Sequence, residues 1–333
     1  MSTITKRSEL VFLYDVTNCN PNGDPMDANR PRINEETGKC LVTDVRLKRT
    51  IRDYLFEKGY NGEHSSLGDI FIRDEKGKPV TGTQRAESYN NINDFKQKFI
   101  DVRLFGAVSA PKKKEADKKT KGKKGAENLE PTDSESEGAE EQVDIQKTFH
   151  FTGPVQFGMG KSLNKVKENF IKGTGAFATQ ETSQQRTFRE EYNITYGLIG
   201  FHGVINENAA RNTNLSENDV NELIEGLWNG TKSLLTRSKK GHMPRLLIKI
   251  DYTQNGFFIG DLLERLSLDF NEGVNEDDIE GINQFKINTD KLIETLQKHD
   301  PKISSITVIK DERVLLTSEI KTKNPVTYES ISI

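Results

Sequence analysis

The chain has 333 residues and a net charge of −3, which allows one large domain or two ordinary ones and excludes a basic surface over the whole protein. Only 33% of its residues are hydrophobic and 30% are charged, so we expect loops and insertions around a modest core. Cys19 and Cys40 are the only cysteines, which argues against a disulfide framework or a zinc site. Met1 to Glu9 lacks a signal-peptide core and no run could span a membrane, so we expect a cytoplasmic protein.

The first part of the chain predicts a strand, a loop and a helix. The apolar run Leu10–Val16 is typical of a buried strand, and the Asn, Gly, Asp and Pro residues at 18–25 favour tight turns. A helix is predicted over Leu41–Leu55, with Thr43 able to cap its N-terminus. The apolar stripe of this helix consists of Leu47, Ile51, Tyr54 and Leu55.

The polar side of that helix carries four cations. Within the helix only Asp44 and Asp53 offset them, and like charges one turn apart repel by roughly 0.2–0.5 kcal/mol. Such a face suits a phosphate backbone, and it is also typical of a solvated face that pairs with acids elsewhere. The four cations are Arg46, Lys48, Arg49 and Arg52.

The middle of the chain contains a segment of different composition. A short strand is predicted at Asp69–Arg73, and Phe95–Phe105 fits a short helix or a strand. Residues 111–142 carry eight lysines followed by seven acids and no aromatic residue, so they cannot offset the entropy of ordering. We interpret them as a disordered insertion. It is either a basic arm for nucleic acid or a solvated loop whose halves neutralise each other, and we favour the second.

After the insertion an alternating strand is predicted at Lys147–Phe151. Gly160-Lys161-Ser162 imitates a P-loop, but Val155 stands where the first glycine is needed, which argues against an NTPase. Lys172 to Tyr196 mixes glycines, hydroxyls, amides, arginines and isolated aromatics. That mixture suits contact with single-stranded nucleic acid, and an ordinary long β-hairpin would also explain it.

The second half of the chain predicts a further strand, helix and strand. A glycine-containing strand spans Tyr196–Ile205, and a helix starts at Ser216, with Asp219 completing a capping box. The helix runs toward Leu235, and Trp228 is expected in the core. A basic turn at 237–245 is a second candidate phosphate patch or a solvated turn.

The remaining predicted elements are the strand Leu246–Ile250, helices near Asp261–Leu268 and Thr289–Lys298, and a strand near Ile303–Ile309. The order of elements is that of an α+β protein and is compatible with a ferredoxin-like βαββαβ core that carries long insertions.

Catalytic patterns are sparse. The five histidines are scattered, without HxH or HExxH spacing, and no GxSxG pattern occurs. Asp15, Asp24 and Asp27 are the only acids that we suspect, because they lie at and beyond the end of the first strand. They could hold Mg²⁺ for phosphodiester cleavage, or they could organise turns.

Several of these stretches together resemble a known family, the backbone subunit of type I CRISPR effector complexes (the seventh Cas family), in its subtype I-B form. The stretches that carry the resemblance are Leu10–Val16, Asn20–Pro25, Val42–Leu55, Thr152–Gly158, Arg186–Tyr192 and Leu227–Lys232. They cover most of the chain outside Pro111–Gln142.

The resemblance implies a modified RRM/ferredoxin-like palm with a finger insertion and a thumb β-hairpin. The palm would be discontinuous, over 1–57 and 148–333, with the finger over 58–147 and the thumb over 159–191. It implies a non-catalytic protein without cofactor or metal that stacks in several copies along one guide RNA (crRNA) and holds it for pairing with target DNA in antiviral defence. The other implied partners are the large subunit, the subunit that binds the 5′ end of the guide and the guide-processing endonuclease.

In the first helix, Thr43, Lys48 and Arg52 match positions where this family contacts guide phosphates. The RNA-binding residues that we predict are Thr43, Arg46, Lys48, Arg49, Arg52, Asn20, Asn22, Phe157, Met159, Lys161, Phe177, Thr179, Gln180, Arg186, Arg189, Arg237, Lys239 and Lys240. The alternative is a metal-dependent ribonuclease, as in the similar subunits of type III complexes, which would cleave guide-paired RNA with an Asp of the 15–27 loop.

Overall fold

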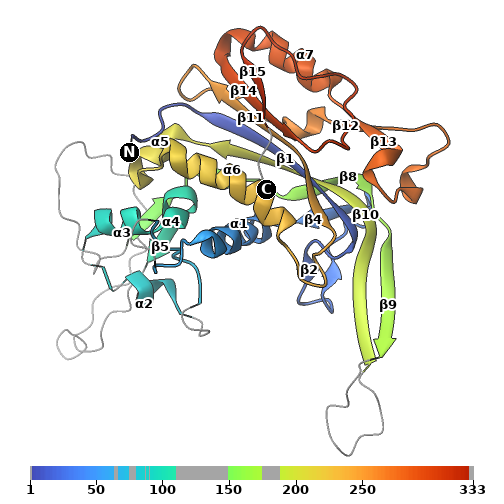
Figure 1. The fold of residues 1–333 in the computed structure, drawn as a ribbon, viewed down its shortest axis with the longest axis horizontal. Helices are drawn as coiled ribbons and strands as arrows, with labels where there is room; N and C mark the ends of the chain where they lie inside the picture. The colour runs from blue at the N-terminus through green and yellow to red at the C-terminus, as the bar shows by residue number, and fades with distance from the viewer. Residues whose placement is uncertain are drawn as a thin grey trace, which may run out of the picture.

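The computed structural model describes residues 2–63, 67–74, 80–86, 88–89, 91–109, 149–174 and 188–329. The charged insertion predicted at 111–142 lies outside these residues. Within them one large sheet has helices on one face and a C-terminal layer on the other (Figure 1). The predicted α+β class is confirmed.

The bounds of the elements follow. The helices are α1 (Asp44–Lys58), α2 (Gly82–Ala86), α3 (Ile92–Lys98), α4 (Ile100–Phe105), α5 (Glu207–Thr213), α6 (Glu217–Lys232) and α7 (Asp290–Lys298). The strands are β1 (Ser8–Cys19), β2 (Gly23–Asp24), β3 (Arg30–Pro31), β4 (Lys39–Val42), β5 (Gly106–Ser109), β6 (Phe149–Thr152), β7 (Val155–Phe157), β8 (Gly160–Lys165), β9 (Glu168–Thr174), β10 (Phe188–Ile205), β11 (His242–Tyr252), β12 (Ser267–Phe270), β13 (Phe285–Asn288), β14 (Ile303–Lys310) and β15 (Val326–Glu329).

The strand order of the main sheet is β15-β14-β11-β1-β10-β8-β4, and β7 and β9 also pair with β10. All pairs are antiparallel except β14 with β15. The chain passes through α1 between β1 and β8, and through α6 between β10 and β11. The four strands at the centre of the sheet are, in spatial order, β11, β1, β10 and β8.

Strand β1 is buried on both faces, which explains its nearly continuous apolar sequence. Phe12 and Tyr14 pack into the core between the sheet and helices α1 and α6. Val11 and Leu13 pack into a second core between the sheet and the C-terminal layer. The predicted strand is confirmed, and it extends through Cys19 because the loop that follows is held against it.

Helices α1 and α6 pack closely because α6 presents glycines to its neighbour. A Cβ atom at Gly226 would lie 3.0 Å from Ile51 Cγ2, and one at Gly230 would lie 3.0 Å from Tyr54 Cβ. The predicted caps are present: the Thr43 side chain accepts from the Arg46 N–H, and Ser216 forms its capping box with Asp219. Trp228 is buried, as expected.

Several elements differ from the sequence-based predictions. The helix expected near Asp261–Leu268 is wrong: a short 3₁₀ turn there leads into β12, which pairs with β13. The strand expected at Asp69–Arg73 is also wrong, because only Asp69 forms isolated bridges. Phe95–Phe105 is resolved as the two short helices α3 and α4. Gly160-Lys161-Ser162 lies inside strand β8 instead of a phosphate-binding loop.

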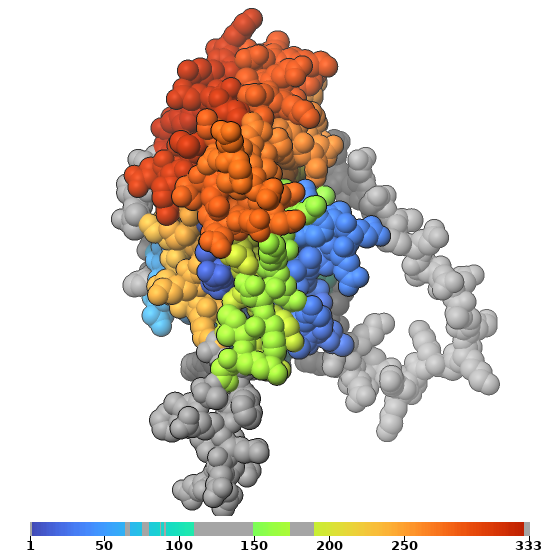
Figure 2. All heavy atoms as spheres, turned by 90° about the vertical axis from the view of Figure 1, so that its right-hand side faces the viewer, coloured from blue at the N-terminus to red at the C-terminus, as the bar shows by residue number. Residues whose placement is uncertain are grey.

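Strands β9 and β10 form a long hairpin arm that extends away from the sheet (Figures 1 and 2). Their pairing runs from Ile194 with Glu168 to Phe188 with Thr174. We call this arm the thumb. Residues 175–187, between the two strands, lie outside the described residues, and the assignment of a thumb to 159–191 stays a prediction.

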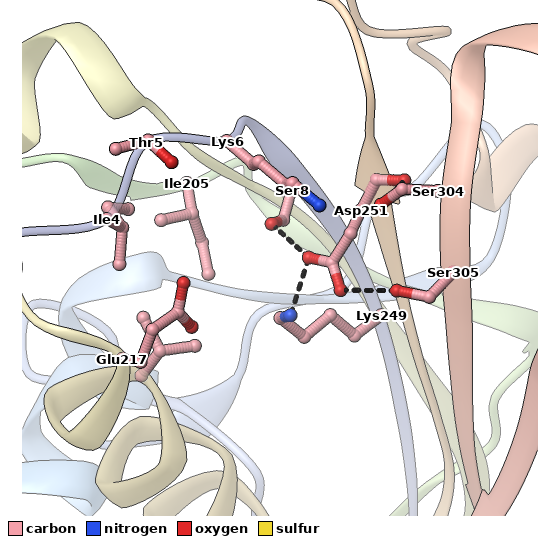
Figure 3. A pocket seen from close by; sticks show the side chains of 11 residues that line it. Ile4, Thr5, Lys6, Ser8, Ile205, Glu217, Lys249, Asp251, Ser304 and Ser305 are labelled. Carbon is pink, nitrogen blue, oxygen red and sulfur yellow. Dashed lines mark hydrogen bonds and ion pairs between the residues drawn. The ribbon is translucent and has the colours of Figure 1, made fainter.

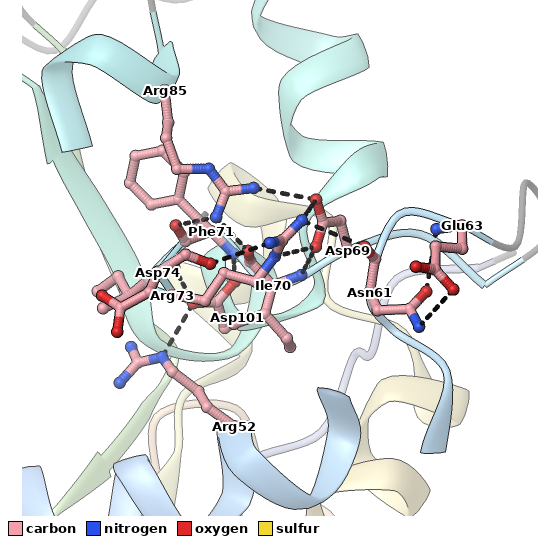
Figure 4. A network of polar contacts seen from close by, with 11 residues as sticks. Arg52, Asn61, Glu63, Asp69, Ile70, Phe71, Arg73, Asp74, Arg85 and Asp101 are labelled. Carbon is pink, nitrogen blue, oxygen red and sulfur yellow. Dashed lines mark hydrogen bonds and ion pairs between the residues drawn. The ribbon is translucent and has the colours of Figure 1, made fainter. Parts of the chain in front are cut away.

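Side chains from described residues between 67 and 109 and from β6 form a third, smaller core rich in aromatic rings, which includes Phe71, Phe95, Phe99 and Phe149. Asp101 joins this core to helix α1 (Figure 4). Its carboxylate accepts from Arg52 Nε at 2.9 Å and from the backbone N–H groups of Phe71 and Ile72 at 2.6 and 3.1 Å.

A second carboxylate joins strands of the main sheet (Figure 3). Asp251 of β11 accepts from Ser8 Oγ of β1 at 2.6 Å and from Ser305 Oγ of β14 at 3.1 Å. Its charge is balanced by Lys249, whose Nζ lies 2.5 Å away. The residues around it line a small polar pocket near the N-terminus, in which Asp251 and Lys249 are paired with each other.

We expect Asp101→Ala to destabilise the protein strongly. It leaves Arg52 and two buried N–H groups without their acceptor, and breaking a buried pair costs about 3–5 kcal/mol. The measurement is the free energy of unfolding in urea. Asp53→Ala is the matched control, because it removes an exposed pair with Arg49 and should cost less than about 1 kcal/mol. Equal losses in the two variants would contradict this role of Asp101.

Candidate nucleic-acid interface

The loop between β1 and β3, residues 20–30, organises the candidate interface. Asn22 Oδ1 accepts from the Thr43 hydroxyl at 3.0 Å and faces the Thr43 N–H at 3.3 Å. Asn20 Nδ2 donates to the carbonyl of Asn29 at 2.6 Å and closes the loop. Gly23 is required because a Cβ atom there would lie 2.8 Å from the same carbonyl oxygen. The loop is thereby fixed to the N-terminus of α1.

The turn that follows α6 is fixed to the same loop. Lys239 Nζ donates to the carbonyls of Asn20 and Pro21. Gly241 allows this approach, because a Cβ atom there would lie 2.2 Å from the carbonyl oxygen of Thr17. Burial, together with the nearby charge of Arg46, lowers the pKa of Lys239 to about 8.

Besides its attachments to α1 and to the turn after α6, the loop between β1 and β3 is attached to the thumb. The Arg30 guanidinium donates to both oxygens of Glu168, at 3.0 and 2.6 Å, and it lies over the Tyr192 ring at 5.4 Å from the centroid. Figure 2 shows the first part of the chain beside the thumb. The base of the thumb is therefore set relative to α1 through one loop.

Most cations of helix α1 already have partners. Lys48 pairs with Asp44 at 2.9 Å and Arg49 with Asp53 at 2.6 Å. Arg52 is engaged by Asp101 and is largely buried against the Phe105 ring. These three residues are paired within the chain, and their contact with a phosphate backbone stays a prediction.

Arg46 differs from the other cations of α1. It donates to the Thr50 hydroxyl at 3.2 Å, and within the described residues no carboxylate forms an ion pair with it. Burial lowers the pKa of this guanidinium. Lys239 lies close to Arg46, the loop that Lys239 contacts is fixed to the Thr43 cap, and the exposed Lys240 follows Lys239 in the chain. We call these four residues the cationic corner. A helix N-terminus and uncompensated cations both favour an anion.

Four further predicted contact residues belong to the described part of the chain: Phe157, Lys161, Met159 and Arg237. Phe157 is 7% exposed and packs against Phe201, and its contact with RNA stays a prediction. Lys161 lies 3.4 Å from Glu264 at the C-terminal layer, away from the corner. Met159 is 51% exposed at the turn before β8. Arg237 pairs with Glu191 at the base of the thumb.

The remaining predicted contacts, Phe177, Thr179, Gln180 and Arg186, lie outside the described residues. Arg189 is placed on β10 by its strand pairing with Gly173, and its side chain is not described. The prediction for the tip of the thumb therefore stays a prediction.

The suspected catalytic acids are held by cations and turns. Asp15 is buried and lies 2.8 Å from Arg245 Nε. Asp24 pairs with Arg32 at 2.9 Å and accepts from the Met26 N–H at 3.0 Å. The described residues contain no group of three His, Cys, Asp or Glu side chains that could hold a metal ion.

Two residues of this region were missed by sequence reasoning. Arg30 was not distinguished from the other loop residues, although it attaches the loop to the thumb. His242 was treated as a scattered histidine, and it lies buried under the cationic corner. His242 lies within the basic turn at 237–245 that the sequence indicated as a candidate phosphate patch or a solvated turn. Burial of His242 depends on the pairing of β11 with β1, which no local pattern reveals.

Comparison with known proteins identifies the family. The family described as CRISPR-associated protein Cas7 matches residues 6–290. A Cas7 protein of Haloferax volcanii is 31% identical over 335 aligned residues, which cover 94% of this chain and 89% of that protein. The chain therefore belongs to the Cas7 family of CRISPR-associated proteins.

Solved structures also align with the chain. A chain of a "CRISPR RNA-guided surveillance complex" aligns with a TM-score of 0.48 and 10% identity, covering 94% of this chain and 91% of that one. A chain of a second such complex, described as pre-nicking, aligns with a TM-score of 0.49 and 11% identity, covering 97% and 96%. Among the described residues, no helix is both long and apolar enough to cross a membrane.

We expect the pKa of Lys239 to be visible in the pH dependence of stability. The folded protein releases this proton near pH 8 and the unfolded chain near pH 10.4, so between these values the unfolded state binds more protons. Stability relative to Lys239→Met should therefore rise with pH across this window, by up to about 1.4 kcal/mol per pH unit. Unfolding in urea at pH 7.5 to 10 measures it. The neighbouring variant Lys240→Met should keep the wild-type slope, and parallel curves for wild type and Lys239→Met would contradict the prediction.

Proposed function

We propose that this protein is a backbone subunit of a type I CRISPR surveillance complex and binds the phosphate backbone of the guide RNA at the cationic corner. The single observation that carries this proposal is the position of Arg46, Lys239 and Lys240. Arg46 and Lys239 lie close together beside the loop that is fixed to the N-terminus of α1, Lys240 follows in the chain, and no described carboxylate forms an ion pair with Arg46 or Lys239. Family membership supplies the class of ligand.

The proposal includes the way in which RNA is recognised. Cations and a helix N-terminus contact phosphate irrespective of base identity, so sequence would be read by base pairing of the guide. Target DNA would then be bound through the guide. Met159 and the tip of the thumb are proposed as further RNA contacts. The thumb would displace a base of the guide at regular intervals.

We further propose that the central sheet is a modified RRM-like palm. The strand order β11-β1-β10-β8, with α1 and α6 as crossovers, is that of a βαββαβ core and supports this assignment. The separate aromatic core of residues 67–109 and 149–152 supports a finger inserted into the palm. The proposed bounds are 58–147 for the finger and 159–191 for the thumb.

The proposed partners are further copies of this chain, the large subunit, the subunit that binds the guide 5′ end and the guide-processing endonuclease. We propose that the protein is not an enzyme. The ion pairs of Asp15 and Asp24 support this proposal, because a carboxylate already neutralised by arginine is a weaker magnesium ligand.

We expect Lys240→Glu to weaken binding of single-stranded RNA without destabilising the fold, because this side chain is exposed. The loss should be equal for two RNAs of unrelated sequence. The plot of log K against log salt should become shallower by about 0.7–1 per lost phosphate contact. Fluorescence anisotropy at several salt concentrations measures both quantities.

Lys298→Glu is the matched control for that experiment. It makes the same charge reversal at an exposed position of α7, on the other side of the sheet from the cationic corner. It should change RNA affinity much less than Lys240→Glu. Equal losses in the two variants would show an effect of net charge alone and would overturn the proposed location.

We expect no magnesium-dependent cleavage of RNA paired to the guide. The assay uses the guide-loaded protein with labelled RNA, in Mg²⁺ and in EDTA, with wild type and Asp24→Asn compared. Cleavage in Mg²⁺ that disappears in Asp24→Asn would favour the ribonuclease alternative and overturn the non-catalytic assignment.

A further inference from the structure

A small cavity lies beneath the cationic corner, where β1, α1, α6 and β11 meet. The volume that the centre of a water-sized sphere can occupy in it is about 10 Å³. The cavity therefore has room for one water molecule or one ion of similar size. Its polar lining comes from Tyr14, Arg46, Thr50, Thr231 and His242, and the rest of its lining is apolar. No carboxylate lines the cavity among the described residues.

The cavity contains polar groups that the fold leaves without partners. His242 is 2% exposed, and its Nε2 has no hydrogen-bond partner among the described residues. Arg46 has five N–H donors and directs one of them to the Thr50 hydroxyl. Unpaired buried polar atoms cost free energy, so something that accepts hydrogen bonds would stabilise this arrangement.

The charge around the cavity is positive. Arg46 lines it, and Lys239 lies close enough for its charge to act on both Arg46 and His242. Burial and these two cations hold the pKa of His242 well below its usual value, so the imidazole is neutral near pH 7. Two cations with no carboxylate in the described lining of the cavity, in a partly desolvated site, favour an anion more than a neutral water.

We propose that this cavity binds one small monatomic anion of the chloride type, held by Arg46 and by the hydroxyl groups of Tyr14 and Thr231. A phosphate group does not fit a space for one water molecule, so the site is distinct from the surface that would contact RNA. Such an ion neutralises charge that the fold itself brings together. It therefore binds the protein in the absence of RNA, which goes beyond the proposed function.

The first experiment locates the ion. Crystals of the full chain without RNA are grown or soaked in sodium bromide, and anomalous diffraction is recorded at the bromine edge. We expect a peak in the cavity next to Arg46 and His242. A cavity that holds only water, with bromide absent there at concentrations that label other sites, would overturn the proposal.

The second experiment measures binding by thermal unfolding at constant ionic strength, with chloride replaced stepwise by gluconate, which is too large for the cavity. At ten times its Kd, chloride should raise the Tm of the wild type by roughly 2–3 °C, with saturation. Arg46→Met should lose this shift. Thr231→Val, which keeps the side-chain volume, should reduce it.

Lys298→Met is the control variant, because it removes an exposed cation far from the cavity and should keep the full shift. An equal chloride effect in wild type and Arg46→Met would indicate a general salt effect and overturn the proposal. Both experiments are done without RNA. Failure of the anion site would thus leave the Lys240→Glu result on RNA binding unaffected, and the reverse also holds.

Discussion

Burial of β1 on both faces is the constraint on which the rest of this structure depends. Phe12 and Tyr14 must be covered by α1 and α6, and Val11 and Leu13 must be covered by the C-terminal layer. The double burial therefore sets the position of both layers and of the loop that leaves the end of β1.

That loop fixes the positions of the surface segments around it. Asn22 holds the N-terminus of α1, Lys239 holds the turn after α6, and Arg30 holds the base of the thumb. Three segments far apart in sequence thereby meet with fixed geometry. The result is positive charge at Arg46 and Lys239 with which no described carboxylate forms an ion pair. Such residual charge is what a phosphate-binding surface needs, and it also accounts for a small anion beneath that surface.

Local patterns predicted the parts of the fold that depend on neighbours in sequence. The Thr43 cap, the Ser216–Asp219 capping box and the burial of Trp228 were all correct, because helix caps and apolar stripes involve residues within two turns. The pattern near 261–268 failed because its residues pair with β13 and pack on the sheet. Such tertiary contacts override weak helical periodicity.

The sequence by itself determined the α+β class, the central strand, the two main helices and the resemblance that the Cas7 family match bears out. It also supplied the set of cations around the first helix. Only the tertiary structure decided which of them remain uncompensated, because ion pairing depends on partners far away in the chain. Asp101 lies 49 positions from Arg52 and removes it from the surface, whereas no described carboxylate forms an ion pair with Arg46. The burial of Phe157 and His242 was decided in the same way, by packing across strands that local sequence does not specify.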